Sequence, residues 1–175
     1  VRQGVTQSFT ATAEGARVGQ RCMLYAAHNA GGDGGWCGIG RRFPQPLNLT
    51  GNQVLGLWIH GDGKGESIRF QLWDSAGRHA DWLPTINYTG WKLHFFPMIE
   101  AGDFDWSRVE YLLFYFNGIP AQTSVQVLLD DLRALPRLLP SPKVARPALT
   151  VNGETTTFPV TLEPGFALTS EGPLG

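Results

Sequence analysis

Residues 54–74 read VLGLWIHGDGKGESIRFQLWD, and the fold prediction starts from this stretch. Side chains along a β-strand point alternately to opposite faces. Two apolar triplets follow that period: Leu55, Leu57 and Ile59, then Ile68, Phe70 and Leu72. The glycines between them permit a tight turn. We therefore predict a β-hairpin that pairs Leu57 with Phe70 and Ile59 with Ile68, because a slip of one residue would set apolar side chains opposite polar ones.

The opposite face of this predicted hairpin is aromatic and polar. It carries Gly56, Trp58, His60, Ser67, Arg69, Gln71 and Trp73. The same register sets Trp58 opposite Arg69 and Gly56 opposite Gln71. One face of the hairpin is thus expected to build a core, and the other to present rings, hydrogen-bonding groups and a gap of glycine size.

Composition restricts the class of protein. The chain has 175 residues with 22 glycines and 12 prolines, which together with many short apolar runs favours an all-β fold. A net charge of -1 with 17% charged residues gives no basic footprint, so nucleic acid and anionic membranes are not expected partners. No apolar run approaches the roughly 20 residues of a membrane span. The chain begins at Val1, and we expect it to be a processed piece of a larger protein.

Eight short strands are predicted between turn signals. They lie at residues 5–13, 21–28, 36–43, 54–74 (two strands), 89–97, 109–117 and 124–135, with residues 79–88 extended and one helical turn at 103–108. This pattern indicates a β-sandwich of the jelly-roll type. In such a sandwich the strands divide into the orders 1-8-3-6 and 2-7-4-5, so we expect strands four, five and seven to share a sheet.

The non-core face of that sheet is the predicted binding site. It gathers Trp58, His60, Arg69, Gln71, Trp73, Tyr111, Tyr115 and Asn117, and we add Tyr25 from the strand at 21–28. Aromatic rings stack on the apolar C–H faces of sugars, while Arg, Gln, Asn and His bond their hydroxyls. Such a face suits a neutral polysaccharide. Two alternatives stay open, namely a surface buried against a neighbouring domain and an ordinary solvated surface.

The segments LNLTG, VLGLWIHGDGKG, SIRFQLWDSAG, NYTGWKLHFFP, VEYLLFYF and VQVLLDDL together resemble the galactose-binding-like jelly rolls. These include carbohydrate-binding modules of glycoside hydrolases and polysaccharide lyases, and the resemblance covers about residues 5–135. It implies that the concave sheet is the glycan site. It also implies a structural calcium ion held by an acid of the last strand, here Asp130 or Asp131, with Glu14 as the nearest N-terminal acid. Two solvated or Arg-paired acids are the other interpretation, because calcium takes six to eight oxygens.

Cys22 and Cys37 are too few for a zinc site of the CxxC type. A disulfide between them and two free buried thiols both remain open, and a disulfide would imply an oxidising compartment. No HExxH, GxSxG or P-loop pattern occurs, and the predicted face has no acid pair of the kind that a glycosidase needs. We therefore expect no catalysis by this chain.

The domain prediction is a jelly roll at 1–135, a proline-rich linker at 136–147, and at 148–175 the truncated start of a following β-domain or a β-arm that packs on the sandwich. The predicted function is that of a secreted or cell-surface, monomeric, non-catalytic carbohydrate-binding module. Its partners are a polysaccharide or oligosaccharide and the catalytic domain of a parent glycoside hydrolase or polysaccharide lyase. The alternative is an architectural or protein-binding sandwich that docks on a catalytic domain without binding sugar.

Overall fold

The computed structural model describes residues 1–136, 144–145, 148–151, 154–157 and 160–161. The chain divides into two compact units, Val1–Pro136 and Arg137–Gly175. In the second unit, β10 (Val144–Ala145) pairs with β13 (Val160–Thr161) and β11 (Ala148–Val151) with β12 (Glu154–Thr157). Most of the predicted linker at 136–147 and much of the segment 148–175 lie outside the described residues, so those predictions stay predictions.

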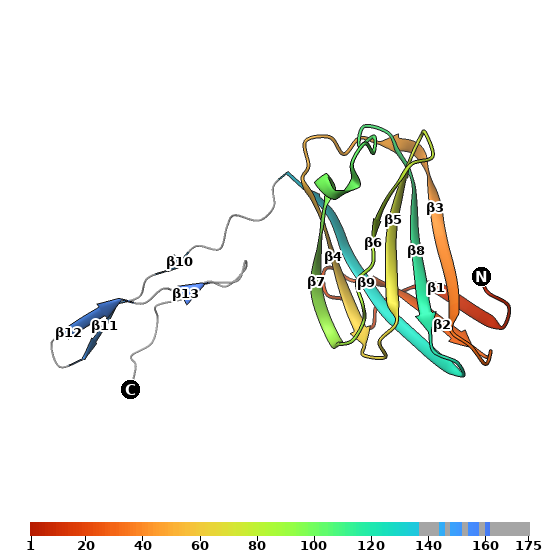
Figure 1. Ribbon diagram of the computed structural model, residues 1–175, viewed down its shortest axis with the longest axis horizontal. Helices are drawn as coiled ribbons and strands as arrows, with labels where there is room; N and C mark the ends of the chain where they lie inside the picture. The colour runs from red at the N-terminus through yellow and green to blue at the C-terminus, as the bar shows by residue number, and fades with distance from the viewer. Residues whose placement is uncertain (137–143, 146–147, 152–153, 158–159, 162–175) are drawn as a thin grey trace. The chain divides into compact units, whose positions relative to one another are not determined.

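The first unit is a sandwich of two antiparallel sheets (Figure 1). The five-stranded sheet has the order β1 (Val5–Thr12), β2 (Cys22–Asn29), β9 (Thr123–Leu135), β4 (Val54–Asp62) and β7 (Thr89–Pro97). The four-stranded sheet has the order β3 (Gly35–Leu47), β8 (Val109–Ile119), β5 (Ser67–Asp74) and β6 (His79–Trp82). The predicted all-β sandwich is confirmed. Among the described residues, no helix is long and apolar enough to cross a membrane.

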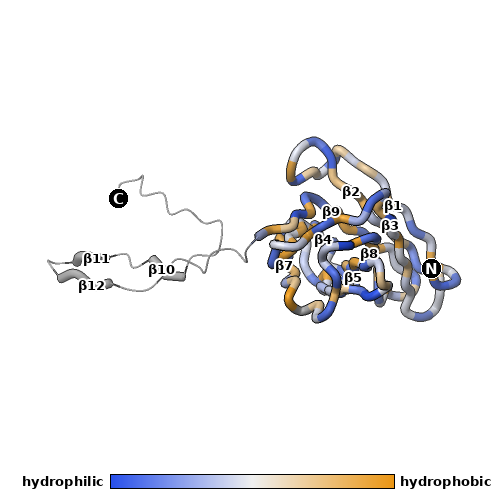
Figure 2. Tube along the Cα trace, turned by 90° about the horizontal axis from the view of Figure 1, so that it is seen from above, coloured by the Kyte–Doolittle hydropathy of each residue, from blue (hydrophilic) through white to orange (hydrophobic). Residues whose placement is uncertain are grey.

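The predicted hairpin at 54–74 is wrong. In the five-stranded sheet β4 lies between β9 and β7, and Leu57 is opposite His94. In the other sheet β5 lies between β8 and β6, and Phe70 is opposite Phe114 and Trp82. Figure 2 shows β4 beside β9 and β5 beside β8. Glycine-rich turns permit positive φ in hairpins and in crossings between sheets alike, so the local sequence did not distinguish the two.

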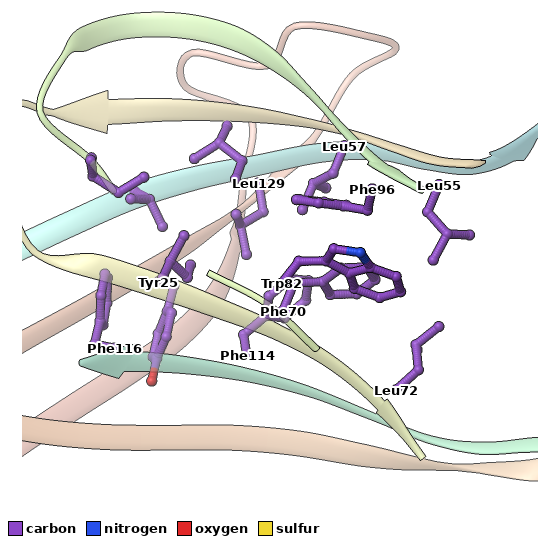
Figure 3. Close-up of a cluster of buried hydrophobic side chains, with 14 of the residues drawn as sticks. Tyr25, Leu55, Leu57, Phe70, Leu72, Trp82, Phe96, Phe114, Phe116 and Leu129 are labelled. Atoms are coloured by element: carbon purple, nitrogen blue, oxygen red, sulfur yellow. The ribbon is translucent and has the colours of Figure 1, made fainter. Parts of the chain in front are cut away.

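The apolar triplets of β4 and β5 both face the core, as predicted, but they meet across the sandwich rather than within one sheet. All six side chains are at most 4% exposed. Phe70 lies at the centre of this core (Figure 3), with ring-centre distances of 5.1 Å to Phe96, 5.4 Å to Trp82 and 5.5 Å to Phe114. Rings at these separations add to the hydrophobic stabilisation of the buried area. The core therefore joins the two sheets through aromatic contacts.

The jelly-roll order is correct once its numbering starts at β2. Counted from β2 to β9, the eight strands give the orders 1-8-3-6 and 2-7-4-5, with β1 added at one edge. The four-residue strand β6, predicted only as extended chain, is the fifth of these eight. Residues 54–62 are consequently the third jelly-roll strand and belong to the other sheet from β5. The helical turn predicted at 103–108 is also wrong, since the 3₁₀ helix η1 lies at Met98–Ala101.

Candidate functional site

The structure does not bring the predicted site residues together on one face. Trp58 and His60 lie on β4, on the outer face of the five-stranded sheet. The outer face of the four-stranded sheet carries Arg69, Gln71, Trp73, Tyr111, Tyr115 and Asn117. We call these two surfaces the five-strand face and the four-strand face. The prediction of a single shared face is wrong because the strands that carry its two halves belong to different sheets.

Tyr25 belongs to neither face. Its side chain is 0% exposed, and its ring stacks on Phe116 at 4.3 Å. The Tyr25 hydroxyl lies 2.9 Å from Gln7 Oε1 and donates to the backbone carbonyl of Cys37 at 3.0 Å. Burial raises the pKa of this phenol far above its usual value. Tyr25 thus ties β2 to β3 across the sandwich, and its assignment as a ligand-binding residue is wrong.

Two adjoining hollows, each of about 530 Å³, lie on the five-strand face. One extends over β1, β2 and β9 and includes Ser8, Ala26 and His28. The other is lined by residues that include His60 from β4 and Glu14 after β1. Asp62 and Gln126 line both. The two hollows together form a continuous trough across the strands.

The floor and wall of the second hollow follow from strand alternation. Register places Leu24 opposite Leu128, Leu128 opposite His60, and His60 opposite Trp91, so these four side chains form a row across four strands. The rings of His60 and Trp91 meet edge to face at 5.4 Å. The floor of the hollow is apolar, the His60 ring is the one ring among its lining residues, and polar groups surround it. This composition is typical of small-molecule and oligosaccharide sites.

Charged groups at the trough are balanced. The two carboxylate oxygens of Asp62 accept the backbone amides of Lys64 at 3.1 Å and Gln126 at 2.8 Å, and Lys64 Nζ lies 3.8 Å from Asp62 Oδ2. His28 Nδ1 and Ser124 Oγ are 2.9 Å apart. No acid pair was expected on the binding face, whereas Asp62 and Glu14 line the second hollow. Asp62 is held by the Lys64 amide of its own turn and by the Gln126 amide of β9, so both carboxylate oxygens already accept a hydrogen bond.

The β1–β2 connection closes the other end of the five-strand face. Asp130 Oδ2 accepts the backbone amides of Arg17 at 2.8 Å and Val18 at 2.9 Å, which fixes the connection to β9. The guanidinium of Arg17 then lies 4.5 Å from the ring centre of Trp58, within cation–π range. A Cβ at Gly15 would come within 2.8 Å of Leu128 Cδ1. This close approach explains why a glycine stands where the connection crosses the sheet.

The acids predicted for calcium do not fit that ion. The backbone amides that bond Asp130 present hydrogens to its carboxylate, where a cation would have to stand. Asp131 bonds Arg133 instead, at 2.6 Å. Among the described residues, no three His, Cys, Asp or Glu side chains gather into a group that could hold a metal. A calcium ion held by Glu14, Asp130 and Asp131 is therefore not supported by the geometry.

Of the two alternatives left open for Cys22 and Cys37, the structure has the free thiols rather than the disulfide, and both cysteines, which lie in the described part of the chain, are buried. Cys22 Sγ lies 3.6 Å from the Glu14 carbonyl, while Cys37 Sγ lies 3.4 Å from the Tyr25 hydroxyl. The two thiols belong to different sheets. Burial raises the pKa of both, so they behave as small apolar side chains.

A buried carboxyl lies in the connection that carries β4 into β5. Glu66 is 1% exposed, and neither of its carboxylate oxygens has a hydrogen-bond partner among the described residues. Burial, with Asp62 nearby, raises its pKa to about 7. His94 Nε2 lies 2.7 Å from the Tyr88 hydroxyl, and burial lowers the pKa of His94 to about 4. Both groups are thus held in their neutral forms at mildly acidic pH.

Sequence reasoning missed Trp91, Arg17, Asp62 and Gln126. The run TGWKLHFFP is apolar on both faces, so alternation alone does not show which of its rings points outward. Arg17 and Asp62 stand in connections, where no period applies. The signal that could have found Trp91 is its pairing with β4, which depends on the strand order rather than on the local sequence.

No family model matches the chain. A mannan endo-1,4-β-mannosidase from Bifidobacterium adolescentis is 29% identical over 68 residues, which are 39% of this chain and 7% of that enzyme. The chain thus matches only a small part of its relative's length.

Solved structures are more informative about the fold. A family 11 carbohydrate-binding module from Clostridium thermocellum, in complex with a β-1,3-1,4-mixed-linked tetrasaccharide, aligns with a TM-score of 0.59 and 15% identity over 77% of this chain and 85% of that chain. The fold is that of the β-sandwich carbohydrate-binding modules. A CBM27 module from Caldicellulosiruptor saccharolyticus in complex with mannohexaose has a TM-score of 0.55 and 14% identity, covering 74% and 83% of the two chains. An exo-β-agarase aligns at 0.57 and 13% identity over 77% of this chain and 23% of its own.

Proposed function

We propose that this chain is a non-catalytic carbohydrate-binding module that binds a neutral polysaccharide in the trough of the five-strand face. The observation that carries the proposal is the pair of adjoining hollows of about 530 Å³ each, one of which has an apolar floor and the His60 ring, in contact with Trp91, at its side. A trough that crosses several strands suits an extended ligand rather than a compact one. A rigid sheet also loses little conformational freedom on binding.

The chemistry of the trough suits sugars. Beside the hollows, Trp58 and Trp91 are partly exposed on the same face, and each offers an aromatic surface on which the C–H face of a sugar ring can stack. Gln126, Glu14 and His28 supply hydrogen-bond donors and acceptors for hydroxyl groups. Each amide, carboxylate and imidazole is a directional partner, which gives specificity in addition to contact area.

Charge favours a neutral ligand over an anionic one. The negative charges of Asp62 and Glu14 balance the positive charges of Lys64 and Arg17 around the trough. These residues therefore give no excess of positive charge that would attract a polyanion. The two neighbours described with ligands bind a mixed-linked tetrasaccharide and mannohexaose, both uncharged. A mannanase and an agarase are among the similar proteins with catalytic names, which supports a parent enzyme that degrades polysaccharides.

The test is affinity electrophoresis of the full chain through gels that contain β-mannan, mixed-linked β-1,3-1,4-glucan or agarose. We expect retardation by one of these and loss of that retardation in Trp91→Ala and Trp58→Ala. Removing an aromatic anchor should weaken binding at least tenfold, or about 1.4 kcal/mol.

The matched control is Ile99→Ala, which removes an apolar side chain that is 88% exposed on η1, outside both hollows. Its retardation should equal that of the wild type. Melting curves of all three variants separate lost binding from lost folding. Wild-type retardation that survives both Trp substitutions would refute the five-strand face as the site, and no retardation by any glycan would refute the function.

A further inference from the structure

We propose that the four-strand face is a second, separate glycan site, which binds a neutral sugar chain across the rings of Trp36, Tyr115, Tyr111 and Trp73. The ligand class rests on the proposed function, but this site uses none of the residues of the five-strand trough. The two surfaces lie on opposite outer faces of the sandwich. One module would then hold two chains, or two segments of one chain.

Register arranges the four-strand face as a grid. One row across the strands runs Gly38, Tyr115 and Arg69, and another runs Arg42, Tyr111, Trp73 and His79. Trp36 stacks on Tyr115 with ring centres 5.5 Å apart and planes 20° apart, and it is 40% exposed. The aromatic surface is thus spread over β3, β8 and β5 rather than concentrated at one point.

Two glycines of β3 let the tyrosines lie flat on the sheet. A Cβ at Gly38 would stand 2.8 Å from Tyr115 Cδ2, and a Cβ at Gly40 would stand 2.1 Å from the Tyr111 hydroxyl. Any other residue at either position would therefore push the ring away. A ring that lies along the sheet presents its π face outward, which is the orientation that stacking on a sugar requires.

Hydrogen bonds hold the other side chains of this face in place. Trp73 Nε1 donates to Gln71 Oε1 at 2.6 Å, and Gln71 Nε2 donates to Asp81 Oδ1 at 3.1 Å. Arg69 Nη1 bonds the other carboxylate oxygen, Asp81 Oδ2, at 3.1 Å and lies over the Tyr115 ring at 5.9 Å. The network fixes the ring edges and orients the donors before any ligand arrives. Such pre-organisation lowers the entropy that binding costs.

A hollow of about 330 Å³ gives this face a defined end. Trp73 and Tyr111 form two of its walls, and the ion pair between Arg42 and Glu110 lies at its rim. This volume is near the lower limit of about 300 Å³ for small-ligand pockets. Aromatic walls with a bidentate donor and a carboxylate are groups that bind sugar hydroxyls. The hollow therefore fits one sugar unit, with the chain continuing over Tyr115 and Trp36.

Charge and ring orientation favour sugar over protein at this face. Arg69 pairs with Asp81 and Arg42 with Glu110, so the cations are neutralised within the face and do not attract a polyanion. Protein interfaces are typically centred on aromatic anchors that fill partner pockets. Here Tyr111 and Tyr115 lie against Gly40 and Gly38 and do not project as anchors.

The experiment is a titration of the ¹⁵N-labelled full chain, in which the six tryptophan indole N–H signals report on each face separately. Mannohexaose and the mixed-linked tetrasaccharide are the probes. We expect shifts in the signals of Trp58 and Trp91 from the first site and of Trp36 and Trp73 from the second. Trp82, which is 8% exposed in the core, is the internal reference and should not move.

Calorimetry with the same probes provides the second readout. We expect two molecules of oligosaccharide per chain, falling to one in Trp73→Ala with the first site unchanged. Ile99→Ala again serves as the control, and the melting temperature reports on folding. A second variant, Trp36→Ala, lies at the other end of the face and should weaken the same site by several-fold.

The outcomes separate the two proposals. Shifts confined to Trp58 and Trp91 would overturn the second site and leave the proposed function standing. Shifts confined to Trp36 and Trp73 would support the second site and remove the first. If those two signals respond only to the catalytic domain of a mannanase and to no glycan, the four-strand face is a protein-docking surface and the proposal is wrong.

Discussion

The two outer faces of the sandwich are built on the same strand alternation, yet they differ in how their aromatic side chains are held. On the five-strand face a connection crosses the sheet, and Arg17 covers one side of Trp58 at 4.5 Å. On the four-strand face Tyr115 and Tyr111 lie against Gly38 and Gly40. The five-strand face is shaped by a loop and contains the larger hollows. The four-strand face is flatter because two glycines leave room for the tyrosine rings.

This difference shows that outward-facing aromatic residues do not by themselves define a surface. What lies in the neighbouring strand or connection decides whether a ring stands in a trough or lies flat. The loop-shaped face should depend on the anchor of its loop, and the glycine-seated face on the small size of two residues. Substitutions at those supports can therefore change one face and leave the other intact.

The largest effect should come from Asp130→Ala. It removes the acceptor of the Arg17 and Val18 amides, and charge-assisted bonds of this kind stabilise a fold by about 2–3 kcal/mol together. Urea unfolding should show that loss, and the indole signal of Trp58 should shift while that of Trp73 stays in place. The control is Asp131→Asn, which removes only a partly exposed ion pair with Arg133. Equal losses in the two variants would contradict the anchoring role.

Glu66→Gln should change how stability depends on pH. The folded-state pKa of Glu66, about 7, lies above its ordinary 4.5, so its stabilising contribution is complete below pH 4.5 and disappears as pH rises to 7. His94, with a pKa of about 4 against 6.5, acts in the opposite direction, since its contribution is complete above pH 6.5 and is lost as pH falls to 4.

Each effect is on the order of 2–3 kcal/mol, and in the wild type the two offset each other. In Glu66→Gln only the His94 trend remains, so the melting temperature should rise steadily from pH 4 to 6.5. A wild-type curve that already rises steeply over this range would contradict the balance. Both outer faces should keep their indole signals, because the change lies in the interior.

Gly38→Ala tests the flat seating of Tyr115. The new methyl group displaces the ring, which we expect to weaken glycan binding at the four-strand face about tenfold, while the free energy of unfolding changes by about 1 kcal/mol or less. The control is Gly34→Ala, where a Cβ would meet nothing within 4 Å. Titration calorimetry with mannohexaose measures the affinity of both variants, and urea unfolding measures their stability. Unchanged affinity with a displaced Tyr115 signal would show that ring orientation is not what this face depends on.

Arg17→Ala should have a small effect confined to the five-strand face. A cation–π contact at an exposed site is worth about 0.5–1 kcal/mol. The melting temperature should fall slightly, and the fluorescence and indole signal of Trp58 should change, with those of Trp36 unaffected. Arg17→Lys, which retains a cation, should restore part of the stability.

Chelation by EDTA should have no effect on the melting temperature of the chain. The carboxylates of Asp130 and Asp131 already bond amides and Arg133. A fall on chelation that added calcium reverses would show a metal site held by other groups.

The sequence was sufficient to predict the two apolar triplets, the β-sandwich and most strand limits, because alternation is a local property. Strand order is not local. The sequence GDGKGE can form the turn of a hairpin or a crossing between sheets. The short strand β6 shows no full alternation period, so it was not counted, and the edge strand β1 was counted as the first jelly-roll strand instead. The hairpin interpretation of this turn set Trp58 beside Arg69, and the shifted count kept their two strands in one sheet.

The site prediction failed for a different reason. Tyr25 alternates with Leu24, which faces outward, so the Tyr25 ring points into the sandwich and is buried against Phe116 of the other sheet. Trp91 meets His60 only through the pairing of β7 with β4, and Arg17 meets Trp58 only through the anchor at Asp130. The chemistry of the face, rings beside hydrogen-bonding groups, could be inferred from residue types, whereas its composition required the three-dimensional arrangement.

The crossing between β4 and β5 has a practical consequence for engineering. Residues 58 and 60 lie on the outer face of one sheet, and residues 69, 71 and 73 lie on the outer face of the other. All five are within 16 positions of the chain. A single short gene cassette can therefore randomise both surfaces at once. Selection for binding to one ligand would then act on one half of the cassette. The other half would stay free to acquire a second specificity.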